Sequence, residues 1–498
     1  MRLENLTAGL PVKEIVSETI NEKNPLEIEI SGLQTDSRRC RGGELFICLT
    51  GGVQDSHTFA EQSIKNGAAA LLTERRLPVT APQIVVENSR VAMSILAANF
   101  YGNPSKKLKI IGITGTNGKT TVSYMLASIL QSAGKSAGVI GTLGITYANK
   151  KIDPELTTPD PIFLHEIFAD MLALGVEYVV MEVSAHAIHY QKLAGVAFTA
   201  CIFTNFSQDH LDFFKDTERY KRAKMELFKP QNCPFAVVNA DDSVGLEISR
   251  LRKGDFQEKT ATYGLENPAD AFAILTHESL YGSEFLMNIA DELCRTVLSM
   301  SGLHNVYNAL AAATCAKYLG VDVAAIRDGL KSLNGVTGRL EYVDTFHGAD
   351  IFVDFAHTPD GLEKSLAALK KHCKGRLICL FGCGGNRDKT KRAPMGETVA
   401  KNADFSVLTS DNPRYEDPLD ILSEIERGYR RFSIKYVVVP DREKAMDYAL
   451  DLVKRGDVLL VAGKGGEEYQ EIMGIKYQFN DNAIIKKLMQ RKRENPFA

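Results

Sequence analysis

A glycine-rich segment in the second hundred residues combines the residue types that hold phosphate groups. Residues 110–121 read IIGITGTNGKTT, so that glycines and a Lys-Thr pair follow a run of apolar, mostly β-branched residues. Gly115 and Gly118 allow backbone N–H groups to approach phosphate oxygens. Lys119 supplies a positive charge, and Thr120 offers a hydroxyl to Mg²⁺ at the start of a helix. The segment therefore predicts a nucleotide site for ATP or GTP.

The spacing of this segment departs from the usual phosphate-loop pattern G-x-x-x-x-G-K-[ST]. Ile113 stands where the first glycine of the pattern belongs, with Gly112 and Gly115 beside it. An ordinary strand–turn–helix connection that needs glycines is the alternative interpretation. We favour nucleotide binding because the segment ends in Gly-Lys-Thr-Thr between a buried strand and an amphipathic helix.

Phosphoryl transfer requires cations beside the phosphates, so acidic and imidazole groups near the loop are candidate Mg²⁺ ligands. Glu182 ends the apolar run VEYVVMEV, and His210 follows the run FTACIFTN in the segment SQDH. A histidine alone is more often structural, and Mg²⁺ prefers oxygen ligands. Lys224, in ERYKRAKMELF, reads as an exposed helical lysine when it is considered alone.

Three charged loops in the last third of the chain follow predicted strands. NRDK follows RLICLFG, DNPR follows FSVLTS, and GKGGEE follows DVLLVAG. Parallel strands end at one edge of their sheet, so a ligand crevice is expected there. The planar guanidinium of Arg414 is suited to a carboxylate. The alternative is that Asn412 and Pro413 form a turn and leave Arg414 in solvent.

The elements that must position these residues alternate between strand-like and helical patterns. They predict an α/β protein of three domains: a small N-terminal α/β domain (1–107), a central P-loop ATPase domain with a parallel sheet (108–335), and a C-terminal Rossmann-like, doubly wound domain (336–498). In the first domain, LEIEI (26–30) is expected as a strand and HTFAEQSIKNGAAALL (57–72) as a helix.

Composition narrows the functional classes. The chain has 498 residues, 44% of them hydrophobic, and a net charge of −3, so it lacks the positive field expected of a nucleic-acid-binding protein. Nine scattered cysteines without C-x-x-C spacing suggest neither disulfides nor a zinc site. With no signal peptide and no long apolar run, we expect a cytoplasmic protein without membrane insertion, and a monomer.

Motifs along the whole chain closely resemble those of the Mur ligase family. They are GTNGKTT, MEVSAHA (181–187), TNFSQDHLDFF (204–214), DFAHTPD (354–360), GCGGNRDKTKR (382–392) and DNPR (411–414). The resemblance implies three domains that hold, in order, a UDP-linked substrate, ATP and an amino acid. It also implies amide formation through an acyl phosphate, with ATP and Mg²⁺ as cofactors.

The resemblance further implies roles for individual residues. ATP would be bound by Gly115, Thr116, Asn117, Gly118, Lys119, Thr120, Thr121, His304, Asn305, Asn308 and Arg339. The UDP-linked substrate would contact Ser37, His57, Thr157, Thr158, Ser184 and Lys192, and the amino acid would contact Arg387, Asp411, Asn412, Arg414, Gly463 and Glu467. Mg²⁺ would be held by Thr120, Glu182, His210 and a carbamylated Lys224, and the catalytic residues would be Lys119, Lys224, His210 and Glu182.

Some of these residues have simpler interpretations. The hydroxyl residues of the UDP group could be turn formers, and Arg339 could form an ion pair between domains. Lys192 stands where the family usually has arginine, Gly466 where it often has histidine, and Phe355 where tyrosine is common. A lysine at 192 would offer a point charge in place of a bidentate contact.

The DNPR segment resembles the form of the family that selects meso-diaminopimelate. The implied substrates are this amino acid and UDP-N-acetylmuramoyl-L-alanyl-D-glutamate, in peptidoglycan precursor synthesis. The lysine-adding form and a folylpolyglutamate synthetase-like ligase are the nearest alternatives. A regulatory P-loop ATPase is an alternative of a different class, although it would leave the charged C-terminal loops unexplained.

Overall fold

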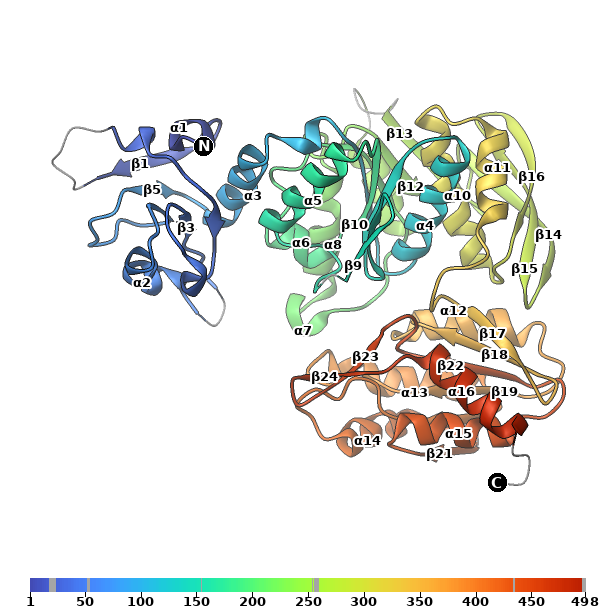
Figure 1. Cartoon of the computed structure of the whole chain (residues 1–498). Helices are drawn as coiled ribbons and strands as arrows, with labels where there is room; N and C mark the ends of the chain where they lie inside the picture. The colour runs from blue at the N-terminus through green and yellow to red at the C-terminus, as the bar shows by residue number, and fades with distance from the viewer. Residues whose placement is uncertain are drawn as a thin grey trace. The chain divides into compact units, whose positions relative to one another are not determined.

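The computed structural model describes residues 1–17, 24–51, 54–153, 155–252, 254, 259–432 and 435–494. The chain forms two compact units, one made of Met1–Gly112 and Ser136–Thr199 and the other of Ile113–Lys135 and Ala200–Ala498. Both combine helices with largely parallel sheets (Figure 1), which confirms the predicted α/β class. Among the described residues, no helix is long and apolar enough to cross a membrane.

The first unit begins with a sheet of five strands in the order β1-β5-β4-β3-β2. They are β1 (Val12–Val16), β2 (Leu33–Gln34), β3 (Leu45–Ile47), β4 (Ala70–Thr73) and β5 (Gln83–Val86), and β1 alone runs antiparallel to its neighbour. The helices here are α1 (Leu3–Leu6), α2 (Ala60–Lys65) and α3 (Ser89–Phe100). The Asn88 side chain accepts hydrogen bonds from the first amides of α3, which explains where that helix begins.

Two expectations for this region are wrong. Residues 26–30 are not a strand, because Pro25–Glu27 forms a 3₁₀ helix that the Asn24 side chain caps. The predicted helix over 57–72 ends early, since α2 stops at Lys65 and Ala70–Thr73 is the buried strand β4. Gly67, at φ +106°, separates the two elements.

The rest of the first unit contains the strand that carries Glu182. Here β10 (Tyr178–Glu182) runs parallel to β7 (Ala137–Gly141), which continues antiparallel into β8 (Gly144–Tyr147) and β9 (Lys150–Ile152). The helices are α5 (Pro161–Ala173) and α6 (Ala185–His189). All five residues of β10 are buried, as its continuous apolar run predicts.

The second unit begins where β6 (Lys109–Thr114) leads into α4 (Lys119–Ser132). Its strands β11 (Phe198–Phe203), β12 (Ala236–Asn239), β13 (Thr260–Gly264) and β14 (Ala271–Ser279) are parallel neighbours. Its helices are α7 (Leu211–Phe214), α8 (Thr217–Met225), α9 (Ser243–Leu251), α10 (Leu303–Tyr318) and α11 (Val323–Ser332). The apolar face predicted for residues 122–130 is fully buried, and α10 and α11 pack against α4.

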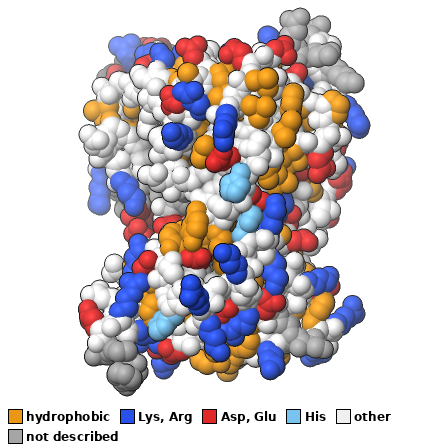
Figure 2. Space-filling view, turned by 90° about the vertical axis from the view of Figure 1, so that its right-hand side faces the viewer, with side chains coloured by type: hydrophobic (Ala, Val, Ile, Leu, Met, Phe, Trp, Pro, Cys, Tyr) orange, Lys and Arg blue, Asp and Glu red, His pale blue; other side chains and the backbone are white. Residues whose placement is uncertain are grey.

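An antiparallel extension, which the sequence did not suggest to us, follows β14. Strands β15 (Gly282–Ile289) and β16 (Glu292–Leu298) pair in succession with β14, and β16 is an edge strand. Their side chains alternate between buried and exposed. Phe272, Ile274, Leu293 and Val297 are exposed, and Figure 2 shows hydrophobic side chains gathered on this side of the molecule.

The C-terminal part of the second unit is a doubly wound sheet in the order β17-β18-β22-β19-β20-β21. The strands are β17 (Glu341–Phe346), β18 (Ala349–Asp354), β19 (Leu377–Phe381), β20 (Phe405–Leu408), β21 (Lys435–Val438) and β22 (Val458–Ala462), all parallel except β17. The helices are α12 (Pro359–Lys370), α13 (Arg392–Asn402), α14 (Pro418–Tyr429), α15 (Arg442–Leu452) and α16 (Asp481–Glu494).

Alternate residues of the C-terminal strands enter two separate cores. One core joins the sheet to α12, α13 and α14, and the other joins it to α15 and α16. Helices therefore cover both faces (Figure 1), which confirms the predicted Rossmann-like class. A two-stranded hairpin, β23 (Tyr469–Ile472) and β24 (Ile475–Gln478), lies outside this sheet.

Candidate active site

The predicted phosphate loop connects β6 to α4. Gly118, which precedes the helix, has φ +86°, and a Cβ at this position would overlap the Asn308 side chain. Gly115 has φ +148°, and a Cβ there would overlap the Thr204 hydroxyl. Both positions require glycine. The amides of Thr116 and Asn117, which lie between them, donate to Asn205 O at 2.8 Å and to Asn205 Oδ1 at 3.0 Å. Residues 115–121 thus have the local structure of a helix N-terminus that can receive an anion.

Two lysines converge on one carbonyl of this loop. Lys119 Nζ donates to the carbonyls of Gly115 and Thr116, both at 2.9 Å, and Lys224 Nζ donates to the same Gly115 carbonyl at 2.8 Å. Burial lowers the pKa of Lys224 well below its ordinary value, and the nearby Lys119 charge lowers it further. Two basic side chains therefore converge on a single backbone oxygen.

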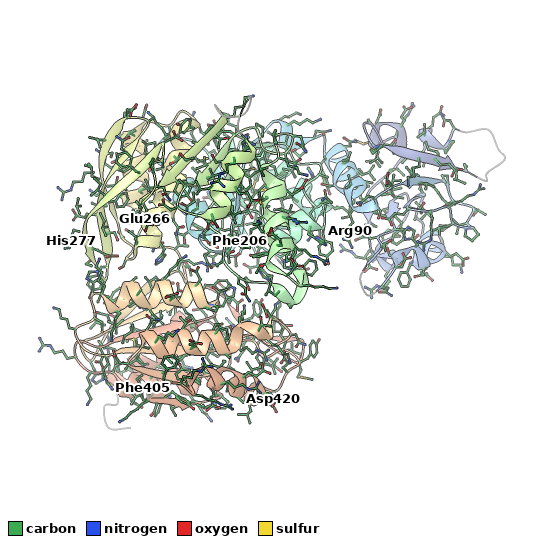
Figure 3. All side chains as sticks on the ribbon, turned by 180° about the vertical axis from the view of Figure 1, so that it is seen from behind. Arg90, Phe206, Glu266, His277, Phe405 and Asp420 are labelled. Atoms are coloured by element: carbon green, nitrogen blue, oxygen red, sulfur yellow. The ribbon has the colours of Figure 1, made fainter. Side chains whose placement is uncertain are left out.

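The interpretation of Lys224 as an exposed helical lysine is wrong, because the side chain is only 1% exposed. Tyr220 precedes it by one turn of α8, and Lys224 Nζ lies 4.4 Å from the centre of the tyrosine ring. The rings of Phe206 and Phe214 pack on Tyr220 at 5.4 and 5.3 Å, and Figure 3 labels Phe206, which follows β11. Tyr220 was not identified from the sequence, although its i, i+4 spacing to Lys224 was readable.

The segment after β11 brings a buried carboxylate to loops of the C-terminal sheet. Asp209 lies 3.4 Å from His210 Nε2, 3.9 Å from His357 Nε2 and 3.4 Å from Lys391 Nζ. Burial by itself raises the pKa of Asp209, but Lys391 and the two imidazoles outweigh it and hold that pKa below its usual range. Asp209 is thus an anion that joins the central and C-terminal parts of the second unit.

The linker residue Arg339 reaches the phosphate loop. Its Nη2 donates to Thr120 Oγ1 at 2.9 Å, and its guanidinium lies 4.3 Å from the centre of the Phe355 ring. A phenylalanine at position 355 therefore serves as a stacking surface for this arginine. On the other side of the loop, Asn117 Nδ2 donates to Asp360 Oδ2 at 2.7 Å. Side chains from the C-terminal part thus contact the loop at both Asn117 and Thr120.

The three residues predicted on the adenine side begin α10. Asn308 is the residue that lies against Gly118, and its amide donates to Asn305 Oδ1 at 3.2 Å. Burial lowers the pKa of His304, which keeps the imidazole neutral. Two of the three, Asn305 and Asn308, are buried, so the start of this helix supports the glycine turn of the loop.

In the first unit, Glu182 lies among hydroxyl groups. Its carboxylate accepts from the amide and hydroxyl of Thr142 at 2.8 and 3.1 Å. Thr158 donates to the Glu182 carbonyl at 3.0 Å and lies 3.3 Å from the Ser184 hydroxyl, while Thr157 and Thr142 share a 3.2 Å contact. The structure therefore brings together four residues predicted from the sequence, and Thr142 joins them as a residue that was missed.

The remaining residues of the predicted UDP group have protein partners of their own. Lys192 pairs with Asp160 at 2.7 Å. His57 is buried, its Nδ1 lies 2.5 Å from Asp55, and its Nε2 accepts from the Glu74 amide at 3.0 Å. Both ring nitrogens of His57 are therefore engaged within the protein. Ser37 is buried in a 3₁₀ turn, where its carbonyl accepts from Asn66 at 2.8 Å.

The charged C-terminal loops meet at one edge of their sheet, as their positions after β19, β20 and β22 predict. Arg414 Nε donates to Glu471 Oε2 and its Nη1 donates to the Gly385 carbonyl, both at 2.9 Å. A Cβ on Gly384 would lie 3.0 Å from Arg414 Nη1 and 3.7 Å from Arg387 Cγ. Both predicted arginines therefore border this glycine, with Arg387 exposed and Arg414 largely covered.

A second cluster lies beside these arginines. The fully buried Lys464 ammonium donates to Asn412 Oδ1 at 3.0 Å and to Glu467 Oε2 at 2.9 Å, and it lies 3.7 Å from Asp411. Burial and the neighbouring Asp411 raise the pKa of Glu467, while Lys464 opposes them. Gly463, at φ +112°, would place a Cβ 3.2 Å from Asp411. Lys464 was not identified from the sequence, where it stands in the charged GKGGEE loop.

The predicted residues thus form separate groups in the structure. The second unit gathers the phosphate loop with His210, Lys224, Asn308 and Arg339, and separately the amino-acid loops; the first unit holds Glu182 and the UDP group. Within the described ranges, no group of three or more His, Cys, Asp or Glu side chains has a metal-binding arrangement. A divalent cation would therefore need the Thr120 hydroxyl, a modified Lys224 or phosphate oxygens among its ligands.

Comparisons with known proteins match most of the chain. Family models match residues 29–101 (Mur ligase family, catalytic domain), 113–316 (Mur ligase middle domain) and 338–465 (Mur ligase, glutamate ligase domain). A relative from Caldanaerobacter subterraneus subsp. tengcongensis is 41% identical over 493 residues, which cover 98% of this chain and 99% of the relative. Its name is UDP-N-acetylmuramoyl-L-alanyl-D-glutamate--2,6-diaminopimelate ligase.

Two further comparisons agree with that result. A protein of the same name from Syntrophomonas wolfei subsp. wolfei is 40% identical over 480 residues, which cover 95% of this chain and 97% of the relative. A solved structure of a ligase with this name is 30% identical, has a TM-score of 0.69, and covers 99% of both chains. The similarity therefore extends through all the regions that carry the predicted site residues.

Proposed function

This chain belongs to the Mur ligase family of ATP-dependent, amide-forming ligases, and we propose that it adds meso-diaminopimelate to UDP-N-acetylmuramoyl-L-alanyl-D-glutamate. The observation that carries this proposal is the contact of C-terminal side chains with a phosphate loop, because the reaction must bring an amine to an acid that ATP has activated. The names of the relatives supply the substrates.

In the proposed reaction, a carboxylate oxygen of the UDP-linked substrate attacks the γ-phosphorus of ATP and releases ADP. The resulting acyl phosphate is attacked by an amine of the amino acid, which forms the amide and releases inorganic phosphate and a proton. Positioning and neutralisation of charge are the main tasks of a protein in phosphoryl transfer. Lys119 and Arg339 are the cations that reach the phosphate loop, at Gly115 and Thr120.

We propose that Lys224 is carbamylated in the active enzyme. Its neutral amine, which burial favours, is the form that adds to CO₂ and gives a carbamate and a proton. The product is an anion, so the contact with Lys119 across the Gly115 carbonyl changes from repulsion to attraction. A carbamate also supplies the oxygen ligands that a magnesium site needs.

The residues proposed for Mg²⁺ are Thr120, Glu182, His210 and the carbamylated Lys224. The ion would neutralise phosphate oxygens of ATP and of the transition state. Two of the proposed ligands, Thr120 and Glu182, offer oxygen without modification, whereas Lys224 does so only as the carbamate. Lys224→Gln should therefore weaken Mg²⁺ binding by the nucleotide-bound protein, measured by titration calorimetry, besides lowering activity.

For the amino acid, we propose that Arg387 and Arg414 receive carboxylates and that Glu467 receives the distal ammonium. Arg414 presents a planar fork, and Glu467 is held by Lys464 and Asn412. Asp411, Asn412 and Gly463 complete the proposed contacts. A lysine ligand has no second carboxylate, so it would leave one of the arginines without a partner.

For the UDP-linked substrate, we propose Ser37, His57, Thr157, Thr158, Ser184 and Lys192. Lys192 would have to exchange its contact with the exposed Asp160 for a substrate anion. His57 uses both ring nitrogens within the protein, so its proposed role is to position the surrounding backbone. We further propose that the protein acts as a monomer in the cytoplasm, where ATP and nucleotide-linked precursors are made.

The test supplies purified protein with ATP, Mg²⁺ and UDP-N-acetylmuramoyl-L-alanyl-D-glutamate, and with either meso-diaminopimelate or L-lysine. We expect ADP release and a new amide product, measured by mass spectrometry, only when the complete set contains meso-diaminopimelate. Selective product with lysine would refute the proposed specificity. ADP release that needs no amino acid would refute the ligase reaction itself.

A further inference from the structure

The hairpin β23–β24 is attached to the loop that carries Arg414. Besides the side-chain contact of Arg414 with Glu471, four hydrogen bonds join them: Gln470 Nε2 to Asp411 O (2.7 Å), Glu471 N to Asn412 Oδ1 (2.9 Å), Arg414 N to Glu471 O (3.0 Å) and Met473 N to Arg414 O (2.7 Å). Residue 414 also forms an isolated parallel bridge with Ile472. The hairpin therefore acts as a support for the DNPR loop.

Arg414 adopts a backbone conformation that requires such support. Its φ is +54°, in the left-handed region, which is unfavourable for an arginine. Its guanidinium is held at two nitrogens, since Nε donates to Glu471 Oε2 and Nη1 donates to the Gly385 carbonyl. Within the described part of the chain, no protein group accepts from Nη2. The fork is thus fixed by the protein while one nitrogen remains available.

We infer that Glu471 is a positioning residue for Arg414 and thereby sets the preference for an amino acid with a distal carboxylate over lysine. This inference rests on the proposed function. Glu471 lies on the hairpin, follows the predicted site residue Glu467 by four positions, and has a side chain that is 21% exposed. It acts through Arg414, and no direct contact with the amino acid is needed.

The physical basis is preorganisation. An arginine side chain loses rotamer entropy when it is fixed, and Glu471 already holds Arg414 before the ligand arrives. The carboxylate of Glu471 also offsets most of the arginine charge. The site then attracts anions of any kind only weakly, and it favours a carboxylate whose position matches the available Nη2 of the fixed guanidinium. Selectivity is the expected result of that combination.

The test measures kcat and KM for meso-diaminopimelate and for L-lysine in the wild type, Glu471→Ala and Glu471→Gln, with ATP and the UDP-linked substrate saturating. We expect Glu471→Ala to raise the KM for meso-diaminopimelate about tenfold with little change in kcat, as for the loss of one charge-assisted hydrogen bond. The KM for lysine should stay within about twofold. Glu471→Gln, which keeps an acceptor for Nε but removes the charge, should give a KM for meso-diaminopimelate between those of the wild type and Glu471→Ala.

Glu468→Ala is the matched control, because Glu468 is an exposed glutamate in the same segment. It should leave both KM values unchanged. Should Glu471→Ala fail to fold, Glu471→Asp shortens the contact while keeping the charge, and it should raise the KM for meso-diaminopimelate severalfold. An unchanged or lower KM for meso-diaminopimelate in the alanine variant, or an equal rise for both amino acids, would overturn the inference.

The wild-type reactions test the proposed function independently of the positioning role of Glu471. A wild type that makes no product with meso-diaminopimelate refutes the proposed function before any variant is compared. A wild type that is active and selective, together with a Glu471→Ala variant that is equally selective, refutes only the positioning role of Glu471.

Discussion

The phosphate loop and the DNPR loop both follow buried parallel strands, yet the basic side chains at the two loops have different partners. At the phosphate loop, Lys119 and Lys224 donate to one backbone carbonyl and Arg339 reaches Thr120, so basic side chains converge on the loop. At the DNPR loop, Arg414 is matched by Glu471, as Lys464 is by Glu467. The phosphate loop is therefore suited to a highly charged anion, and the DNPR loop to a ligand that carries both positive and negative groups.

This difference indicates how each region gains its selectivity. An excess of positive charge binds polyphosphate strongly and needs little beyond backbone amides and cations. A balanced set of charges attracts weakly, so it depends on the positions of its groups, and those positions are held by neighbouring side chains. Loss of a charge should therefore affect catalysis most at the first region and discrimination most at the second.

The largest effect should come from Lys119→Met. The substitution removes the charge expected at the β- and γ-phosphates, and amide formation should fall about a thousandfold or more. Steady-state assays of amide product measure the loss, and thermal unfolding checks that the fold is kept. A variant that retains a tenth of wild-type activity would contradict the contrast between the two regions.

A smaller loss, about a hundredfold in kcat, should follow Lys224→Gln, which removes the amine that is proposed to be carbamylated. Lys221→Ala, on the same helix but paired with Glu218 and Glu247, is the control and should keep near-normal activity. Growth in ¹³C-bicarbonate followed by ¹³C NMR should detect a carbamate in the wild type and not in the variant. Equal activity of the two variants would refute a chemical role for Lys224.

Discrimination, rather than activity, should change in Arg414→Ala. We expect the preference for meso-diaminopimelate over lysine to fall by about tenfold or more, since one charged fork is lost. ATP binding, measured by calorimetry, should survive because the phosphate loop contacts other side chains. Arg414→Lys should restore part of the affinity but little of the selectivity. Unchanged selectivity in the alanine variant would contradict the assignment of the DNPR loop.

A buried group outside both regions should affect stability alone. His165 on α5 is fully buried, neither ring nitrogen has a hydrogen-bond partner in the described structure, and burial lowers its pKa from 6.5 to about 4. Because the unfolded chain then binds a proton more readily, stability should be lost as the pH falls below about 6.5. The loss at pH 5 is about 2 kcal/mol from this histidine.

His165→Met should remove that loss. Chemical unfolding at pH 7 and pH 5 should show the wild type losing about 2 kcal/mol more than the variant over this interval. Activity at pH 7 should be unaffected. Equal losses in the two proteins would show that His165 is not responsible for the pH dependence.

Local patterns were enough to predict the positions of the loops that carry the proposed site residues. The apolar runs before Gly115, Asp411 and Gly463 predicted buried parallel strands, and the loops after them have the expected places. The predicted limits of strands and helices were wrong at two positions. Pro25 begins a 3₁₀ helix within an apparent strand, and Gly67 separates α2 from β4 within an apparent helix. A periodicity of two residues marks β15 and β16 in the sequence, and our prediction did not include these strands.

Local patterns did not indicate contacts distant in sequence, although the resemblance to the Mur ligase family assigned Lys224 and Arg339 to the ATP and Mg²⁺ site. Nothing local indicates that Lys224 lies under a loop 109 residues earlier, that Arg339 reaches Thr120, or that Glu471 holds Arg414. These contacts depend on packing between elements, which sequence spacing alone does not encode. The supporting residues of a site are therefore harder to identify than the residues of its motifs.

The most direct test of the central claim is a transfer of isotope. UDP-N-acetylmuramoyl-L-alanyl-D-glutamate with ¹⁸O in the reacting carboxylate is incubated with the protein, ATP, Mg²⁺ and meso-diaminopimelate, and the inorganic phosphate is analysed by mass spectrometry. Because the acyl phosphate bridges through a carboxylate oxygen, we predict one ¹⁸O atom in each phosphate for each amide formed. Phosphate without ¹⁸O, or label that appears in AMP, would contradict activation by phosphoryl transfer at the phosphate loop.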